Sequence, residues 1–359
     1  MDTAMSSLRI RFPAAAVTQL VLAKVGNPQR EEPLQMSREV LRVGSDDRDL
    51  LTSLFLKPFR NLLPHRFHHP TSLETHEMNS LAKEIFRNPA ALLENGCAMA
   101  RRLYAKSQHP NIKSGDLCIA LVEGVDVESD SVKAICILKS ETVSPFLSIA
   151  SEDGDLRLRT EHGINPEKID KGCLILNHWQ NTGLCVLTFD RTGGESRFWV
   201  REFLGLQAIP DSAFLTQTYA EMAVAAVRQQ PEIAAAPEES ARASREVLDW
   251  FDGREDFDLA AFETEVLKSP EAVAHFEEVR ARFEEDEGVP LDASFSIEPK
   301  EVKKAARRAT AVLQTDTGVE IRIRPEATAH AASSVERGFD EDRGMNFIKV
   351  WFHEIVEAS

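Results

Sequence analysis

The sequence predicts an α+β protein, with a mixed helix and antiparallel meander N-terminal domain followed by a second, smaller α+β domain. Three features predict it: a row of β-rich apolar runs in mid-chain, helical periodicity on both sides of that row, and a proline-containing break further along. Turn-forming residues separate most of the runs, which favours an antiparallel meander over a nucleotide-binding βαβ unit. The runs are Leu117–Val122, Val132–Leu138, Gly172–Asn177 and Leu184–Phe189.

The N-terminal domain is expected to span residues 1–228. Its first strand is predicted within Phe12–Ala23, and Pro13 and the missing cleavage site argue against a secretory signal peptide. A helix should begin at Ser45, and a second should follow the Asn88-Pro89 start signal. After the meander, Ser212 is expected to cap a helix that ends near Arg228.

Residues 229–238 are the expected linker, because they contain two prolines and few large apolar side chains. The C-terminal domain, residues 239–359, should begin with acidic helices within Glu239–Glu287, of which the last starts at Ser269-Pro270 and stops at Gly288. Aromatic residues are expected to anchor these helices: Trp250, Phe251, Phe262, Phe276 and Phe283. Three strand signals complete the domain: Ala293–Ile297, a hairpin formed by Thr310–Gln314 and Val319–Arg324, and Phe347–Val356.

The net charge of −16 argues against a surface that binds DNA or an anionic membrane over its whole area, since both partners are negative. A local basic patch can still act over a Debye length of about 8–10 Å. The five cysteines form no CxxC pair, which disfavours a disulfide framework or a zinc site and fits a reducing cytoplasm. No apolar run approaches the ~20 residues of a membrane span.

Several short motifs together suggest a family. They are Val25-Gly26-Asn27-Pro28, Leu56-Lys57-Pro58-Phe59, Arg66-Phe67-His68-His69, His109-Pro110-Asn111-Ile112-Lys113-Ser114-Gly115, Ile135-Cys136-Ile137-Leu138-Lys139, Phe198-Trp199 and Phe203-Leu204-Gly205. With these motifs the chain resembles the bacterial nucleoid-associated protein family NdpA, whose members are YejK-like. The C-terminal strand signals around Gly318 and Phe347 fit the same family. The resemblance implies a cytoplasmic protein of the bacterial nucleoid that binds DNA, and it supplies no catalytic signature to carry across.

A basic cluster near the C-terminus is the candidate nucleic-acid-binding site. Its first five members recur at helical spacings, and its last two share one side of the following strand. Such a group can contact phosphates without reading sequence. The structural alternative is a solvated face neutralised by neighbouring glutamates. The residues are Lys300, Lys303, Lys304, Arg307, Arg308, Arg322 and Arg324.

Two further groups were weighed as sites. Arginines and histidines between Arg60 and His76 suggest a metal site, but no carboxylate or cysteine at ligand spacing completes a set, so no metal is expected. They include His65, Arg66, His68 and His69. Asp126 and Lys139 imitate a nuclease motif in which carboxylates hold Mg²⁺, but Ile137 occupies a position that should be acidic.

On a strand, Arg197, Trp199 and Arg201 would share one face that can stack on bases, although an ordinary strand edge is favoured. Neither a glycine-rich phosphate loop nor a G-x-S-x-G elbow occurs, so no cofactor and no catalytic residue is expected.

The expected function is non-enzymatic, sequence-nonspecific binding of double-stranded DNA in the bacterial nucleoid, with a role in chromosome organisation and a homodimer as the working state. The sequence does not separate DNA from RNA. Self-association is expected through Phe347–Phe352, a strand near the chain end. Two alternatives stay open: an adaptor whose acidic helices recruit a basic partner or a DNA-processing enzyme, and a degenerate metal-dependent nuclease in genome maintenance or defence.

Overall fold

The computed structural model describes residues 8–152, 155–179, 181–192, 197–229, 237–309, 311–314, 316, 318–323 and 335–351. The chain divides into two compact units, of which the first is Leu8–Ile209 and the second begins at Pro210. The predicted boundary lies about twenty residues later, near Arg228. The difference arises because the helix that ends at Arg228 packs on the helices of the second unit. Most of the predicted linker lies outside the described residues.

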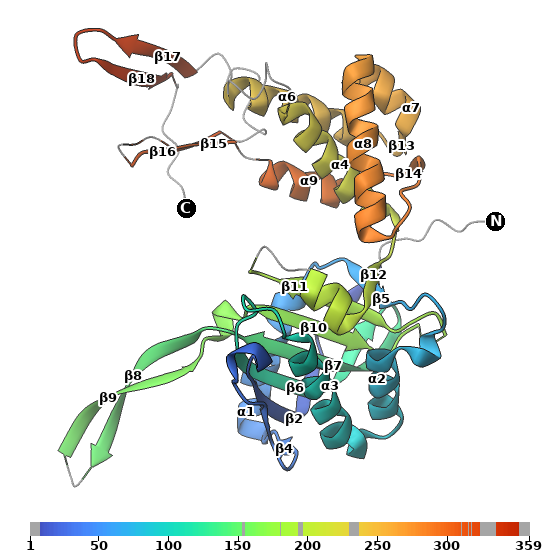
Figure 1. Cartoon of the computed structure of the whole chain (residues 1–359), viewed down its shortest axis with the longest axis vertical. Helices are drawn as coiled ribbons and strands as arrows, with labels where there is room; N and C mark the ends of the chain where they lie inside the picture. The colour runs from blue at the N-terminus through green and yellow to red at the C-terminus, as the bar shows by residue number, and fades with distance from the viewer. Residues whose placement is uncertain are drawn as a thin grey trace. The chain divides into compact units, whose positions relative to one another are not determined.

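The N-terminal unit is built on a ten-stranded antiparallel sheet (Figure 1). Its main path runs β12-β5-β11-β10-β7-β6-β2-β3, while β1 pairs with β6 and β4 pairs with β2. The four predicted runs are β6, β7, β10 and β11, which lie side by side in chain order, so the meander is confirmed. The strands are β1 Ile10–Arg11, β2 Ala16–Val25, β3 Gln35–Met36, β4 Leu41–Arg42, β5 Pro64–Phe67, β6 Gly115–Val127, β7 Asp130–Ser140, β10 Lys171–Leu176, β11 Cys185–Asp190 and β12 Leu206–Ala208.

Helices cover both faces of this sheet. Along β6, Ile119 and Leu121 belong to the core under α2 and α3, whereas Ala120 and Val122 belong to the core under α1. Burial on both faces explains why the central strands read as continuous apolar runs rather than as alternating ones. The helices are α1 Ser45–Leu56, α2 Glu77–Arg87 and α3 Leu92–Lys106, with short 3₁₀ turns at Pro28–Arg30, Lys57–Phe59, Leu73–Thr75, Pro89–Ala91 and Pro166–Lys168.

A long hairpin, β8 Val143–Glu152 with β9 Asp155–Ile164, is inserted between β7 and β10. This hairpin is not among the elements expected from the sequence. Its two strands pair with each other and form a sheet of their own. In Figure 1 this ribbon extends away from the main sheet.

The expectation that Arg197, Trp199 and Arg201 share a strand face is wrong. Arg197–Leu204 forms a π-helical segment, because a helical turn brings Phe198, Trp199, Phe203 and Leu204 together into the core. The Trp199 indole Nε1 donates to Thr188 Oγ1 at 3.1 Å. Trp199 is therefore a buried anchor of the sheet and is not available to stack on bases.

The C-terminal unit packs helices around an aromatic core, and the five predicted anchors are buried or partly buried in it. Asp211, rather than Ser212, caps α4, since its Oδ1 accepts from Phe214 N at 2.8 Å. Ser269 caps α8 and left-handed Gly288 ends it, as predicted. The elements are α4 Ser212–Arg228, α6 Pro237–Asp252, β13 Asp256–Asp258, α7 Leu259–Phe262, a π-helical turn at Glu263–Leu267, α8 Pro270–Glu287, β14 Ser294–Ser296 and α9 Pro299–Arg308.

Two hairpins follow α9. The predicted one is confirmed as β15 Ala311–Gln314 paired with β16 Glu320–Ile323. The predicted last strand begins at Met345 as β18 Met345–Val350 and pairs with β17 Val335–Asp340, while the chain from Phe352 onward lies outside the described residues. Within the part of the chain that the structure describes, no helix combines the length and apolar character needed to cross a bilayer.

Candidate nucleic-acid interface

Helix α9 presents the basic cluster on one side. Its inner side buries Glu301, Val302, Ala305 and Ala306 against the C-terminal core. The outer side carries five of the seven predicted cations, of which Lys304 is half-buried and the others are exposed: Lys300, Lys303, Lys304, Arg307 and Arg308. The predicted helical spacing therefore places five positive side chains along one helix.

Carboxylates lie beside two of these cations. Lys304 Nζ is 2.7 Å from Glu301 Oε1, and the Arg308 guanidinium pairs with Glu221 of α4. The Arg308 pair is largely exposed, and an exposed ion pair contributes only about 0–1 kcal/mol. A phosphate can therefore replace Glu221 as the partner of Arg308 at little cost. Basic residues in the last turn also stabilise α9 through the helix dipole, which is a structural role for Arg307 and Arg308.

A cleft of about 290 Å³ separates α9 from α6. Lys303 and Arg307 line it from α9, and Arg245, Asp249 and Asp252 line it from α6. These side chains supply three positive and two negative charges, and Leu248, Val302 and Ala306 are the apolar lining. The cleft is wide enough for a phosphate and carries a small positive excess.

One of the two remaining predicted cations falls on the first terminal hairpin. Arg322 lies in β16, opposite Val312 of β15, and Arg324 lies outside the described residues. The hairpin β15–β16 contacts α6, the helix that forms the other wall of the cleft. The strand of Arg322 thus contacts the helix that forms one wall of the cleft.

The histidine loop is a structural corner around His76. His76 caps α2, since its Nδ1 accepts from Asn79 N at 3.1 Å, and its Nε2 then donates to Gly205 O at 2.9 Å. Among the described residues, no group of three His, Cys, Asp or Glu side chains is placed to hold a metal ion. His65 and Arg66 lie in β5, and exposed Arg60 precedes that strand.

We expect His76 to make the N-terminal unit sensitive to acid. Desolvation lowers the pKa of His76, so the unfolded chain binds its proton more readily than the folded one. The stabilisation is complete above the ordinary pKa of about 6.5 and is lost as the pH falls through the lower folded value. His76→Asn keeps a good cap and should flatten the loss of unfolding free energy between pH 7 and pH 5, measured by urea titration. His162→Asn, on exposed β9, is the control, and an unchanged slope in His76→Asn would contradict the prediction.

Asp126 and Lys139 do not form the nuclease motif. Asp126 is opposite Ser131 at one end of the β6–β7 pair, and Lys139 is opposite Leu117 at the other. Nine residues of β6 separate the two positions, which is about 25–30 Å at ~3.3 Å per residue. Asp126 and Lys139 therefore cannot share a metal site. The register of the sheet, and not the spacing in the sequence, decides which strand ends lie close together.

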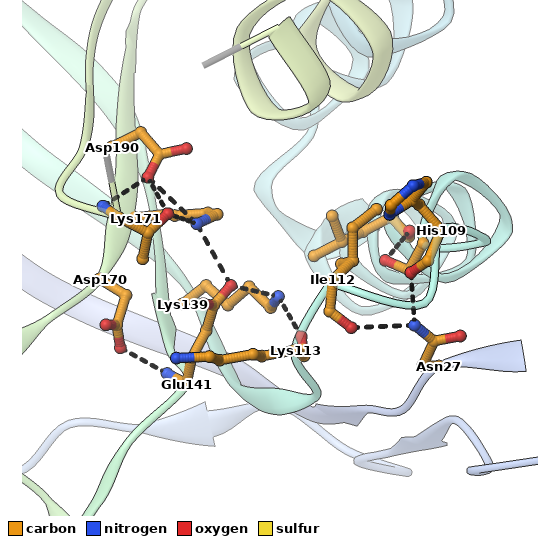
Figure 2. A network of polar contacts seen from close by, with 12 residues as sticks. Asn27, His109, Ile112, Lys113, Lys139, Glu141, Asp170, Lys171 and Asp190 are labelled. Carbon is orange, nitrogen blue, oxygen red and sulfur yellow. Dashed lines mark hydrogen bonds and ion pairs between the residues drawn. The ribbon is translucent and has the colours of Figure 1, made fainter. Parts of the chain in front are cut away.

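Lys139 instead belongs to a buried ionic cluster with Glu141, Lys171 and Asp190 (Figure 2). Lys139 Nζ is 2.7 Å from Glu141 Oε1, and that oxygen is 3.4 Å from Lys171 Nζ. Lys171 Nζ also lies 3.1 Å from Asp190 Oδ1. Burial lowers the pKa of the Lys139 ammonium, although Glu141 acts in the opposite direction.

The cluster was missed by sequence reasoning, although a signal for it exists. Charged residues lie at corresponding ends of three consecutive strands: Lys139 late in β7, Lys171 first in β10 and Asp190 last in β11. An antiparallel meander brings these ends to one edge, and Lys171 is indeed opposite both Lys139 and Asp190.

The ionic cluster and Asn27 fix the same loop. Asn27 is fully buried, and its Nδ2 donates to the carbonyl oxygens of His109 and Ile112, both at 2.9 Å. Lys139 Nζ donates to Lys113 O of that loop at 2.7 Å (Figure 2). Three of the motifs that carry the family resemblance therefore meet in space: residues 25–28, 109–115 and 135–139.

A comparison with protein families gives the same assignment. Residues 22–344 match the family model described as nucleoid-associated protein YejK. No curated protein matches the chain. The matched range contains the three converging motifs, the meander and α9. Because it covers most of the sequence, the resemblance is confirmed, and the chain belongs to the nucleoid-associated protein YejK family.

Proposed function

We propose that this protein binds double-stranded DNA without sequence specificity, in the cytoplasm at the bacterial nucleoid, and contributes to chromosome organisation without enzymatic activity. The observation that carries the proposal is the row of cations on the outer side of α9 in a chain of the nucleoid-associated family. Lysine and arginine side chains on phosphates give affinity and orientation but carry no sequence information.

The dimensions of α9 suit a duplex backbone. Lys300 and Arg308 are eight residues apart, which is about 12 Å along a helix. Phosphates along one strand of B-DNA rise by about 3.4 Å each, so the row faces three to four of them. Three to four contacts of this kind fit a protein that coats or bridges DNA rather than one that reads bases in a groove.

A local patch can act despite the net charge of −16. Charges further away than about 8–10 Å are largely screened at physiological salt. Acidic residues beside the row include Glu221 and Glu301, which pair with Arg308 and Lys304, Glu298 at the start of α9, and Asp249 and Asp252 in the cleft, and Glu301 is buried. The affinity of the proposed contact is therefore set by the local charges on α9 and by the salt concentration, and much less by the net charge of the whole molecule.

We expect the affinity for duplex DNA to fall steeply with salt and to be the same for unrelated sequences. Three to four neutralised phosphates give a log–log slope of about −2.7 to −3.6, at about 0.9 per phosphate. Fluorescence anisotropy with two unrelated duplexes from low to physiological salt measures both properties, and an RNA duplex of equal length tests the preference for DNA. A salt-independent affinity, or a strong preference for one DNA sequence, would overturn the proposal.

An adaptor function is the second candidate, and helix α8 favours it. Opposite buried Phe276, α8 exposes Glu271, Glu277, Glu278 and Glu285. Such a surface can attract a basic protein, including a DNA-processing enzyme. No duplex binding at low salt, together with salt-sensitive capture of a lysine-rich peptide that is lost when Glu277 and Glu278 are replaced by Gln, would select this function.

Self-association is part of the proposed function. The strand suggested by the sequence lies partly in β18, where Val350 and the following Trp351 are largely exposed, whereas Phe352 lies outside the described residues. Pairing of β18 with β17 leaves one edge of each strand open within the described hairpin.

A further inference from the structure

We propose that the β8–β9 ribbon is a dimerisation arm that packs against the same ribbon of a second copy of this chain. The inference rests on the self-association part of the proposed function but not on DNA binding. It replaces β18 by a different surface, which the sequence analysis did not identify. The ribbon's pairing register and side-chain exposure carry the inference.

The register makes the ribbon amphipathic. Directly opposite residues share a face of an antiparallel pair, and faces alternate along each strand. Val143 is opposite Ile164, Ile149 is opposite Leu158, and Ser151 is opposite Leu156. With Leu147, these side chains place six large aliphatic groups on one face, which otherwise carries Pro145, Ser151, Thr160 and His162. The opposite face carries most of the charge: Glu152, Asp155, Arg157, Arg159 and Glu161.

The aliphatic face lies in water in the single chain. Leu147, Ile149, Leu156 and Leu158 are 67–72% exposed. A two-stranded hairpin is only marginally stable by itself and needs a further layer over its apolar face. Scattered exposed aliphatic residues are normal on proteins, but six on one face of a two-stranded ribbon, interrupted by the Pro145–His162 pair, mark an interaction surface.

The aliphatic face continues into a cleft at the base of the ribbon. Ile164, the last residue of β9, lines a cleft of about 340 Å³ together with Leu22, Met36 and Leu117. Leu22 is itself 39% exposed. Lys24, Gln35, Ser37 and Asp116 line the same cleft, so the aliphatic face of the ribbon ends in a partly polar cleft within the N-terminal unit.

A second copy is the occupant that this surface fits. The face carries no Asp, Glu, Lys or Arg, so it offers nothing to phosphates, while two copies with a charge of −16 can meet there without burying like charges. A two-fold axis near Leu147 places the base of one ribbon, with Val143 and Ile164, on the tip of the other ribbon. These two aliphatic residues then meet Leu156 of the second copy. Each tip then reaches the other base cleft, and the contact is isologous.

The area of the aliphatic face limits how two copies can meet. Ten residues at ~3.3 Å and two strands at ~4.8 Å give a face of roughly 320 Å² in projection. Two such faces alone fall short of the ~1,200 Å² total of a small stable interface, and the two clefts extend them towards it. Each ribbon therefore has to cover both the ribbon and the cleft of its partner. This arrangement buries more area than a contact between the ribbons alone.

Adjacent positions provide a matched test by sedimentation velocity across protein concentrations. Ile149→Glu puts a carboxylate on the aliphatic face, and Ala150→Glu puts the same group on the polar face opposite Arg157. We expect the wild type and Ala150→Glu to form dimers of equal affinity, and Ile149→Glu to raise the dimer Kd at least 100-fold. Because Ile149 is 72% exposed, its replacement should leave the fold intact, which circular dichroism checks.

A shortened chain gives a second arm of the test. Val143 and Ile164 are opposite each other, so an Asn-Gly turn can join them and remove the ribbon between them. This variant should be monomeric. A monomeric wild type, equal dissociation by Ala150→Glu, or dissociation by Trp351→Glu alone would overturn the inference. Anisotropy with a short duplex separates the two proposals: a monomeric Ile149→Glu that still binds DNA supports both, and a wild-type dimer that does not bind DNA removes only the DNA function.

Discussion

Replacing Lys303, Lys304, Arg307 and Arg308 by alanine should flatten the salt dependence of duplex binding by up to about 3.6 in log–log slope. Each phosphate contact contributes about 0.9 to the slope through released counterions. The same contacts contribute about 0.9 decade each at 0.1 M salt, so the affinity should fall by up to about 3.6 orders of magnitude. Anisotropy titrations of wild type and variant at four salt concentrations measure both quantities.

A control must separate local from global charge. The variant changes the net charge from −16 to −20, which by itself weakens the attraction to any polyanion. Alanine replacement of four exposed cations of the N-terminal unit gives the same net charge: Arg38, Arg87, Arg101 and Lys106. We expect the slope of this control to stay within about 0.5 of the wild type. An equal loss in both variants would exclude α9 as the specific contact.

A second variant guards against loss of folding. Lys304 is the partner of Glu301, whose side chain is 8% exposed, so removing Lys304 leaves a nearly buried carboxylate without that partner. Lys300, Lys303 and Arg307 are exposed, and replacing these three by alanine keeps the Lys304–Glu301 pair. The triple variant should lose up to about 2.7 of slope while staying folded, with at most the small loss of stability, about 0.3–1 kcal/mol, that removing Arg307 from the last turn causes. Unaltered binding by this folded variant would contradict the prediction.

Local patterns predicted those parts of the fold in which residue spacing alone decides the structure. The four meander strands and the α8 start and stop follow from apolar runs, a proline and a glycine. The β8–β9 ribbon was missed although Leu147 and Ile149, then Leu156 and Leu158, alternate around Asp153-Gly154, which is a hairpin signal. Arg197–Leu204 satisfies both a strand and a helical pattern, and burial of Trp199 against Thr188 selects the helical one.

The candidate sites also differ in how far local sequence patterns predict them. The cations of α9 are neighbours along one helix, so their spacing predicts their common face. Lys139, Lys171 and Asp190 are 19 to 51 residues apart in the sequence, and only strand register brings them together. A nuclease pattern inferred from Asp126 and Lys139 failed for that reason. Side chains joined by tertiary register become predictable only once the pairing of the strands is known.

Lys139→Met should lower the unfolding free energy of the N-terminal unit by about 3–5 kcal/mol, because breaking a buried ion pair leaves an uncompensated charge. Glu141 is 4% exposed and would keep only the longer 3.4 Å contact with Lys171 Nζ. The Lys113 carbonyl would lose its 2.7 Å donor at the same time. Hydrogen exchange of the β7 and β10 amides reports the stability of this unit separately from the other.

Neutralising the partner should restore part of that loss. Burial lowers the pKa of Lys139 even though Glu141 raises it, which indicates that desolvation of the ammonium outweighs its pairing. Lys139→Met combined with Glu141→Gln removes both charges of the pair, so the double variant should be more stable than Lys139→Met alone. Lys133→Met, a half-buried position on the same strand, is the matched control and should change stability by less than about 0.5 kcal/mol. If Lys139→Met were as mild as Lys133→Met, the cluster would not hold the β7, β10 and β11 ends together.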